Sequence, residues 1–305
     1  MKPRHLAILL MVAVMCLWGS TFVVTKETIV EIPPLTLAFI RVSIGALVLA
    51  PFALYRHRRA PPGQSLPWLA IAQLGFIGVA FYYTAFNLGM SRTSASQGAL
   101  VQSCIPAMTA LVAVVLLRER ASRTRLAGIA LSIVGVLVIF SGSAAGYAGA
   151  SLSGNVLIFA SVIAWGVYTS IAKRIADFDS VVVTACIIGC GALMLLPLAL
   201  FESGTADFPM LTARGWAGMF YLGALASGIA FLVYNYSLRY MEAGQAGVFA
   251  NLIPVVGVLS GIVFLHEPLS WRSILGGLVV MLGVWITGAQ KSSDSSFLPR
   301  SPGED

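Results

Sequence analysis

A single arginine inside a long apolar run is the residue of this chain best placed for chemistry. Arg41 lies eight residues beyond Pro33, where the run begins, so a helix would carry it about 12 Å along its axis. A charge at that depth in a membrane is costly next to lipid, so Arg41 is expected to face the protein interior or a watery cavity. There its guanidinium could bind a carboxylate or phosphate through two hydrogen bonds. The alternative is a structural role, with the guanidinium tied to helix-end carbonyls or to neutral side chains.

Polar and aromatic side chains in other apolar runs are candidates to line a cavity around Arg41. Gln102 lies at a comparable depth, about 10 Å into its own run. Tyr83 and Asn87 are four residues apart and therefore share one helix face. For each residue taken alone, hydrogen bonding or packing between helices is the alternative. Together with Arg41, the predicted substrate-binding residues are Gln102, Ser103, Tyr83, Asn87, Trp18, Trp165, Tyr168, Tyr234, Asn235 and Asn251.

Two prolines and four charged residues could control access to such a cavity. Pro106 and Pro254 lie near the centres of two runs, where proline removes a helix hydrogen bond and tends to kink the helix. We predict a paired hinge there, with static packing as the alternative. Charged residues near the ends of runs could brace gates or loops, although exposed ion pairs contribute only ~1 kcal/mol or less. These candidates are Lys26, Lys173, Glu119 and Glu267.

The apolar runs that carry these residues predict a membrane protein. Hydrophobic residues make up 58% of the chain and charged residues 10%, whereas about a quarter of the residues in soluble domains are charged. Each run is near the ~20 residues with which a helix crosses the hydrocarbon core. The predicted fold class is an all-α polytopic membrane protein with ten transmembrane helices. The runs cover approximately residues 6–26, 33–55, 66–89, 95–117, 124–142, 153–173, 180–201, 214–239, 243–265 and 271–290.

The ten runs form two sets of five that repeat one another at an offset of 148 residues (235 − 87 for a pair of asparagines). Because five is an odd number of crossings, the second copy must be inverted in the membrane relative to the first. Inverted repeats are typical of alternating-access carriers, whose substrate site lies at the interface of the two halves. The repeated pairs include Asn87 and Asn235, Gln97 and Gln245, Pro106 and Pro254, and Glu119 and Glu267.

The predicted organisation places one five-helix repeat in each half of the chain. Basic residues concentrate in the tails and connections on one side of the ten spans. By the positive-inside rule that side is cytoplasmic and holds both termini. The net charge of +7 therefore reports topology, and the predicted partners are the lipid bilayer and a small-molecule substrate, with no nucleic acid. The units are a first repeat over 1–142, a linker over 143–152, a second repeat over 153–290 and a cytoplasmic tail over 291–305.

Glycines at seven-residue spacing mark two runs as close-packing helices. Gly128, Gly135 and Gly142 follow one face of the fifth span, and Gly276 and Gly283 follow one face of the tenth. Such faces let helix backbones approach closely, which favours helix association in lipid. Contact between the two spans within one chain is one interpretation. A homodimer through spans five and ten is the other.

Residues for covalent, metal or cofactor chemistry are missing from the predicted spans. The sequence has no HExxH or GxSxG motif, and no Asp or Glu lies near the middle of a span. The cysteines lie within spans and lack metal-ligand spacing with a histidine. We therefore predict neither an enzyme nor a bound cofactor or metal. Proton coupling through a buried carboxylate is not expected either, and facilitated diffusion, substrate exchange or coupling through a less obvious group fits the sequence better.

Short motifs spread over both halves together resemble those of one known superfamily. They are Trp18-Gly19-Ser20-Thr21-Phe22 with Lys26, Arg41, Ala85-Phe86-Asn87, Arg118-Glu119-Arg120, Trp165-Gly166, Tyr234-Asn235-Tyr236 and His266-Glu267-Pro268. With these motifs the whole chain resembles drug/metabolite transporters, and among them the EamA-type ten-helix permeases. One departure is that Arg41 has no counterpart in the second half, where offsets of 147 and 148 give Ile188 and Gly189.

This resemblance implies an inner-membrane carrier of small metabolites, commonly amino acids or related amphoteric compounds, that often exports them. It implies no particular substrate, because members with similar motifs differ in cargo. The alternatives are a multidrug or other small-solute exporter or facilitator of the same superfamily, and a channel-like pore.

Overall fold

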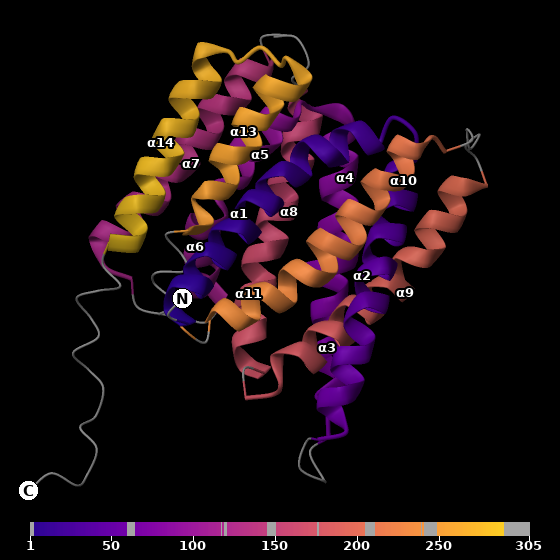
Figure 1. Ribbon diagram of the computed structural model, residues 1–305. Coiled ribbons are helices and arrows are strands. Elements are labelled where there is room, and N and C mark those ends of the chain that lie inside the picture. Colours follow the sequence, from indigo (N-terminus) through magenta and orange to yellow (C-terminus); the bar gives the residue numbers. More distant parts are fainter. Residues whose placement is uncertain are drawn as a thin grey trace, which may run out of the picture.

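Long helices joined by short connections make up the computed structural model (Figure 1). The all-helical class predicted from the sequence is confirmed, because no strand is present among the residues that the structure describes. Those residues are 3–59, 65–116, 118, 121–144, 151–175, 177–204, 211–238, 240 and 249–289.

The first half of the chain supplies five helical segments of membrane length. Two of them are single helices that open the chain, one closes the half, and two are composed of shorter pieces. The elements are α1 (Pro3–Thr28), α2 (Pro34–His57), α3 (Trp68–Gly75) with η1 (Phe76–Phe81) and α4 (Tyr82–Arg92), α5 (Ala95–Gln102) with α6 (Ile105–Leu116), and α7 (Arg123–Ala144).

The second half follows the same order. Its elements are α8 (Leu152–Ala172) with the 3₁₀ turn η2 (Lys173–Ile175), α9 (Ser180–Ser203), α10 (Ala213–Phe220) with η3 (Tyr221–Ile229) and α11 (Ala230–Leu238), α13 (Leu252–Leu265), and α14 (Trp271–Ala289). Over the described residues, nine helical segments are long and apolar enough to cross a membrane, and α13 is a shorter apolar helix. The predicted runs coincide with these segments to within a few residues, except that residues 243–248 of the ninth run lie outside the described ranges.

The third and eighth segments each contain a π-helical stretch at equivalent positions. The stretches η1 and η3 end at Phe81 and Ile229, which are 148 residues apart. A π turn is rare, and it is often found where a helix serves a functional site. The sequence pattern predicted continuous helices here, so both stretches are features that only the structure shows.

The fourth and ninth segments are interrupted beside the two predicted prolines. Helix α5 ends at Gln102 and α6 begins at Ile105, immediately before Pro106. In the second half a turn at Asn251 precedes α13, whose first turn contains Pro254. Proline cannot donate the backbone hydrogen bond that would continue the preceding turn. Each proline therefore lies at an interruption of its segment, while the hinge function itself stays a prediction.

The glycine faces of α7 and α14 pack against each other within the chain, and the two helices lie side by side in Figure 1. A Cβ atom at Gly135 would lie 2.7 Å from the Gly276 carbonyl oxygen, and a Cβ at Gly276 would lie 2.7 Å from the Gly135 carbonyl oxygen. Only glycine permits such a close approach of two backbones. The contact within one chain is thus shown, and the homodimer through these spans stays a prediction.

The outer surface of the bundle carries many large apolar side chains. Leu47, Phe201, Phe264 and Trp285 are examples, and each is largely exposed. A soluble monomer rarely exposes extended apolar patches, whereas lipid tails solvate them. The helices and this surface together indicate an integral membrane protein.

Candidate functional site

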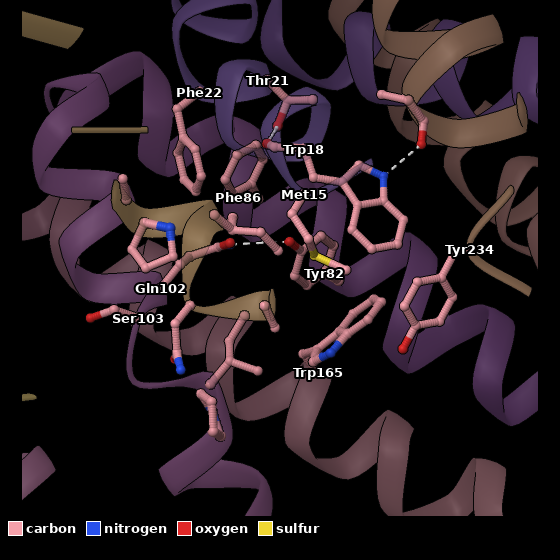
Figure 2. Close-up of a pocket in the computed structure, with 18 of the residues that line it drawn as sticks. Met15, Trp18, Thr21, Phe22, Tyr82, Phe86, Gln102, Ser103, Trp165 and Tyr234 are labelled. Carbon is pink, nitrogen blue, oxygen red and sulfur yellow. Dashed lines mark hydrogen bonds between the residues drawn. The ribbon is translucent and has the colours of Figure 1, made fainter. Parts of the chain in front are cut away.

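A cavity of about 260 Å³ lies near the middle of the spans, where the two halves of the chain meet. The first half contributes residues of α1, α2, α4, α5 and α6 to its wall. The second half contributes residues of α8, η3, α11 and α13. Figure 2 shows side chains from both halves gathered around this space. The volume is slightly below the roughly 300–1,000 Å³ of pockets for drug-sized ligands, so it suits a small solute.

Arg41 lines this cavity and is buried, with 4% of its surface exposed. Its Nε and Nη1 atoms have no hydrogen-bond partner among the described residues. The guanidinium carbon lies 4.6 Å from the centroid of the Tyr83 ring, a cation–π contact that offsets only part of the cost of burying a charge. The predicted inward orientation is therefore observed. The structural ties that were the alternative are missing for these two nitrogens in the described part of the chain.

Neutral polar groups occupy the cavity wall beside the interruption of the fourth segment. The Gln102 amide nitrogen donates to the Tyr82 hydroxyl at 3.1 Å and lies 3.4 Å from the Ser161 hydroxyl. The Ser103 hydroxyl donates to the Leu100 carbonyl at 2.6 Å, which satisfies a carbonyl near the end of α5. In the described ranges no cluster of His, Cys, Asp or Glu is placed to hold a metal ion. Apart from Arg41, the described polar groups of the cavity wall are therefore neutral hydrogen-bonding groups.

Aromatic rings form much of the remaining wall, as Figure 2 shows for Trp18, Tyr82, Trp165 and Tyr234. The Trp18 indole donates its N–H to the carbonyl of Ala226 in η3 at 3.0 Å, and this bond fixes the ring. Ring centroids lie 5.4 Å apart for Trp18 and Tyr234, and 5.3 Å apart for Tyr82 and Trp165. Spacings of this size are those of favourable aromatic pairs. The predicted residues Trp18 and Trp165 therefore line the cavity, and Tyr82 packs between Trp165 and Phe86.

The cavity is closed on one side and exposed on the other. Phe22 and Phe86 are buried, and their rings meet edge to face with centroids 5.8 Å apart. Pro106 and Asn251, which line the cavity in the fourth and ninth segments, are exposed. The cavity wall is therefore more exposed on the side of Pro106 and Asn251.

Carboxylates from one half bind the starts of helices from the other half at the end of the bundle where α1 ends and α2 begins. We call this end the capped end; it is the upper end in Figure 1. Glu31 accepts hydrogen bonds from the Thr212 hydroxyl at 2.7 Å and amide at 2.9 Å, just before α10. These two bonds lower the pKa of the Glu31 carboxyl. Glu202, at the end of α9, accepts from the Thr36 amide at 2.7 Å and hydroxyl at 3.0 Å in α2.

Glu267 makes the third connection of this kind. Its carboxylate accepts hydrogen bonds from the amides of Ala95 at 2.7 Å and Ser96 at 2.8 Å, the first residues of α5. A carboxylate at a helix N-terminus also interacts favourably with the helix dipole. The sequence suggested pairing of Glu267 with a basic side chain; its hydrogen bonds go to backbone amides, and the nearby Lys26 ammonium interacts with its carboxylate electrostatically. Lys26, also a gate or loop candidate, donates to the carbonyls of Met90 at 2.9 Å and Thr93 at 2.6 Å at the end of α4.

The structure brings most of the predicted substrate-binding residues to one cavity. The lining includes Arg41, Gln102, Ser103, Tyr83, Trp18, Trp165, Tyr234 and Asn251, together with both prolines. Tyr168 instead packs on Trp165, with ring centroids 5.0 Å apart, and lines a smaller neighbouring cavity. The Asn87 amide nitrogen donates to the Pro34 carbonyl at 2.9 Å, so this side chain joins α4 to the start of α2. Glu119 and the side chains of Asn235 and Lys173 lie outside the described residues.

Several lining residues were not predicted, although the sequence held a signal for some of them. Phe22 lies four residues after Trp18, and Phe86 lies four residues after Tyr82, so each pair shares a helix face. Aromatic residues at this spacing are common in helix packing, which hides their role. The missed lining residues include Met15, Thr21, Phe22, Tyr82, Phe86, Ala226 and Phe231.

The fold recurs in a solved crystal structure. The two structures match with a TM-score of 0.63 at 21% sequence identity, and the match covers 97% of this chain and 99% of the other chain. At this identity the likeness concerns the fold alone.

Curated relatives of similar length carry transporter names. An uncharacterized transporter of Archaeoglobus fulgidus is 27% identical over 285 residues, which cover 93% of this chain and 97% of the relative. The uncharacterized transporter YetK of Bacillus subtilis is 26% identical over 299 residues, or 97% of this chain and 91% of the relative. The model of the EamA-like transporter family matches residues 5–141 and again residues 152–289. With two matches that together span most of its length, the chain belongs to the EamA-like transporter family.

Proposed function

We propose that this transporter is a secondary carrier that exports small metabolites bearing a carboxylate or phosphate, such as amino acids and related amphoteric compounds. The observation that carries the proposal is the buried Arg41, which lines a cavity built by both halves and has two nitrogens without a partner among the described residues. Arginine suits carboxylates and phosphates because its donors match their two oxygens.

The proposed topology is a pair of inverted five-helix repeats in the inner membrane, with both termini in the cytoplasm. Lys26 in the last turn of α1 binds the Thr93 carbonyl, and the Thr93 hydroxyl donates to Asn155 in the first turn of α8 at 2.7 Å. Helix α1 therefore ends at the capped end, where its counterpart α8 begins. The distribution of basic residues supports a cytoplasmic location for the opposite end. The capped end then faces outward and the exposed side of the cavity faces the cytoplasm.

Alternating access is the proposed mechanism, and an asymmetry between the two ends of the bundle supports it. At the capped end, Glu31, Glu202 and Glu267 each accept two hydrogen bonds from the other half. At the opposite end, Arg56 and Asp179 form a partly exposed ion pair at 2.8 Å between the halves, and such pairs contribute little. Opening of the capped end would break the carboxylate contacts, while bending at the two interrupted segments would let the halves rock. Substrate would then meet one face of the membrane at a time.

Counterflow in liposomes tests this function. Vesicles containing the full chain are loaded with an unlabelled metabolite mixture, and entry of labelled amino and organic acids is followed. We expect the internal substrate to accelerate entry of the labelled one, and we expect Arg41→Met to abolish that effect. Arg92→Met, which makes the same change at an exposed arginine near the end of α4, is the matched control. Conductance without counterflow would instead favour the channel-like pore, and equal activity of Arg41→Met would remove Arg41 from the site.

A further inference from the structure

The charge balance of the cavity narrows the class of substrate. Of the described residues that line it, Arg41 alone is charged. The other polar groups in the lining are neutral hydroxyl, amide and indole groups. A buried charge without a counter-charge is destabilising, and a bound anion would remove that cost. Among the described residues, the cavity wall therefore carries one positive charge and no negative charge.

A zwitterion would restore this balance poorly. In an α-amino acid the ammonium is attached next to the carboxylate, so docking the carboxylate on Arg41 also brings a second positive charge close to the guanidinium. The described lining offers this ammonium aromatic faces and neutral oxygens but no carboxylate. Like charges in a site of low dielectric constant repel each other strongly. A compound with one negative charge and no ammonium fits the wall better.

The shape and composition of the wall describe the rest of the ligand. Trp18, Tyr82, Phe86 and Trp165 present ring surfaces to the cavity (Figure 2). Phe22 and Met15 add further apolar surface. Flat apolar groups gain both from burial and from favourable ring geometry when they pack against such side chains. The volume of about 260 Å³ leaves room for a small body rather than a drug-sized one.

We propose that the cavity binds a small organic monoanion with a flat apolar body, its carboxylate on Arg41 and its ring among the aromatic side chains. This inference rests on the proposed carrier function and narrows its substrate class from carboxylate compounds in general, amino acids included, to monoanions without an ammonium group. Gln102, whose amide nitrogen donates to Tyr82 and lies near the Ser161 hydroxyl, holds Tyr82 in place beside the bound ring.

A panel of four probes that differ in one feature at a time tests the substrate class. The reference probe is 3-phenylpropionate. Its amide lacks the charge, phenylalanine adds an ammonium, and propionate lacks the ring. Binding to the purified full chain is measured by isothermal titration and by the rise in thermal midpoint, since a ligand of the folded form raises it. We expect 3-phenylpropionate to bind at least tenfold more tightly than each of the other three.

Variants of the arginine separate charge from geometry. Arg41→Met should remove the preference for the acid over its amide, and Arg41→Lys should keep a weaker preference because lysine retains the charge but not the planar donor pair. Arg92→Met should behave as the wild type. Size-exclusion elution and helical circular dichroism show whether each variant is folded. If Arg41→Met does not fold, binding of the four probes to the wild type and to Arg41→Lys tests the substrate class.

The outcomes distinguish this inference from the carrier function. Tighter binding of phenylalanine or of the amide than of the acid would overturn the monoanion class, while counterflow of the better ligand would leave the carrier intact. Failure of all four probes to bind at millimolar concentration would also overturn the class. Selective binding of the acid without counterflow would support the site and refute the carrier.

Discussion

Glu267→Gln is the substitution that tests most directly how the capped end is held closed. The carboxylate accepts two hydrogen bonds, at 2.7 and 2.8 Å, from the first two amides of α5. A hydrogen bond to a charged group contributes about 1.5–3 kcal/mol, and the interaction with the helix dipole adds about 0.3–1 kcal/mol. Glutamine keeps one acceptor oxygen but presents an N–H₂ group to the other amide. We therefore expect a loss of about 2 kcal/mol in the free energy of opening at this end, most of one charged bond.

Hydrogen exchange of the Ala95 and Ser96 amides measures this loss. At 1.4 kcal/mol per factor of ten, about 2 kcal/mol corresponds to roughly 30-fold faster exchange. Glu27→Gln is the matched control, because Glu27 pairs at 3.2 Å with Arg214, whose side chain is 81% exposed. That pair should contribute little, so the control should leave exchange in α5 unchanged. Unchanged exchange in Glu267→Gln, or equal acceleration in both variants, would refute the reasoning.

Three further predictions follow from the packing, the interruptions and the opposite end. Gly135→Val should lower the thermal midpoint of the purified protein by an overpacking cost of about 1–3 kcal/mol, since its Cβ would lie 2.7 Å from a facing backbone oxygen; an unaltered midpoint would contradict the close α7–α14 contact. Pro106→Ala and Pro254→Ala should slow counterflow more than they change ligand affinity, and faster counterflow would exclude a hinge. Burial acts to raise the pKa of Asp179, but hydrogen bonds from Arg56 and from backbone amides lower it overall. The stabilisation by the Arg56–Asp179 pair should therefore be fully present above the ordinary pKa range of a carboxyl group and be lost only at more acidic pH. Asp179→Asn should lower the free energy of unfolding by less than ~1 kcal/mol near neutral pH. A larger loss at neutral pH would contradict this prediction.

The sequence predicted the helical segments well because hydropathy and segment length are local properties. It also predicted the burial of Arg41, because a charged side chain at that depth is costly next to lipid and is therefore expected to face the protein interior. The same reasoning was less informative for neutral polar residues. Asn87 and Gln102 look alike in the sequence, yet one binds the Pro34 carbonyl and the other faces the cavity. Which of these occurs depends on helix rotation and on contacts between distant segments.

Features that depend on backbone irregularity could not be predicted from residue type alone. The π-helical stretches before Tyr82 and Ala230 contain no proline, so nothing in their composition distinguishes them from an α-helix.

The connection of Glu267 to α5 depends on Gly261, where a Cβ would meet the Ser96 hydroxyl and lie 2.8 Å from a Glu267 carboxylate oxygen. A lone glycine in an apolar helix suggests packing, but it does not identify the partner. Pairwise geometry between the halves supplied that information.

The two interruptions at Ser103 and Asn251 both border the same small cavity. If the segments bend there, as we propose, a solute in the cavity contacts both bending points at once, and its occupancy and the helix angles then belong to a single thermodynamic cycle. Whatever factor bending applies to the binding constant, the solute must apply the same factor to the bending equilibrium. In that case a substitution that stiffens either segment also changes the dissociation constant of the solute, even if the substituted residue does not contact the solute.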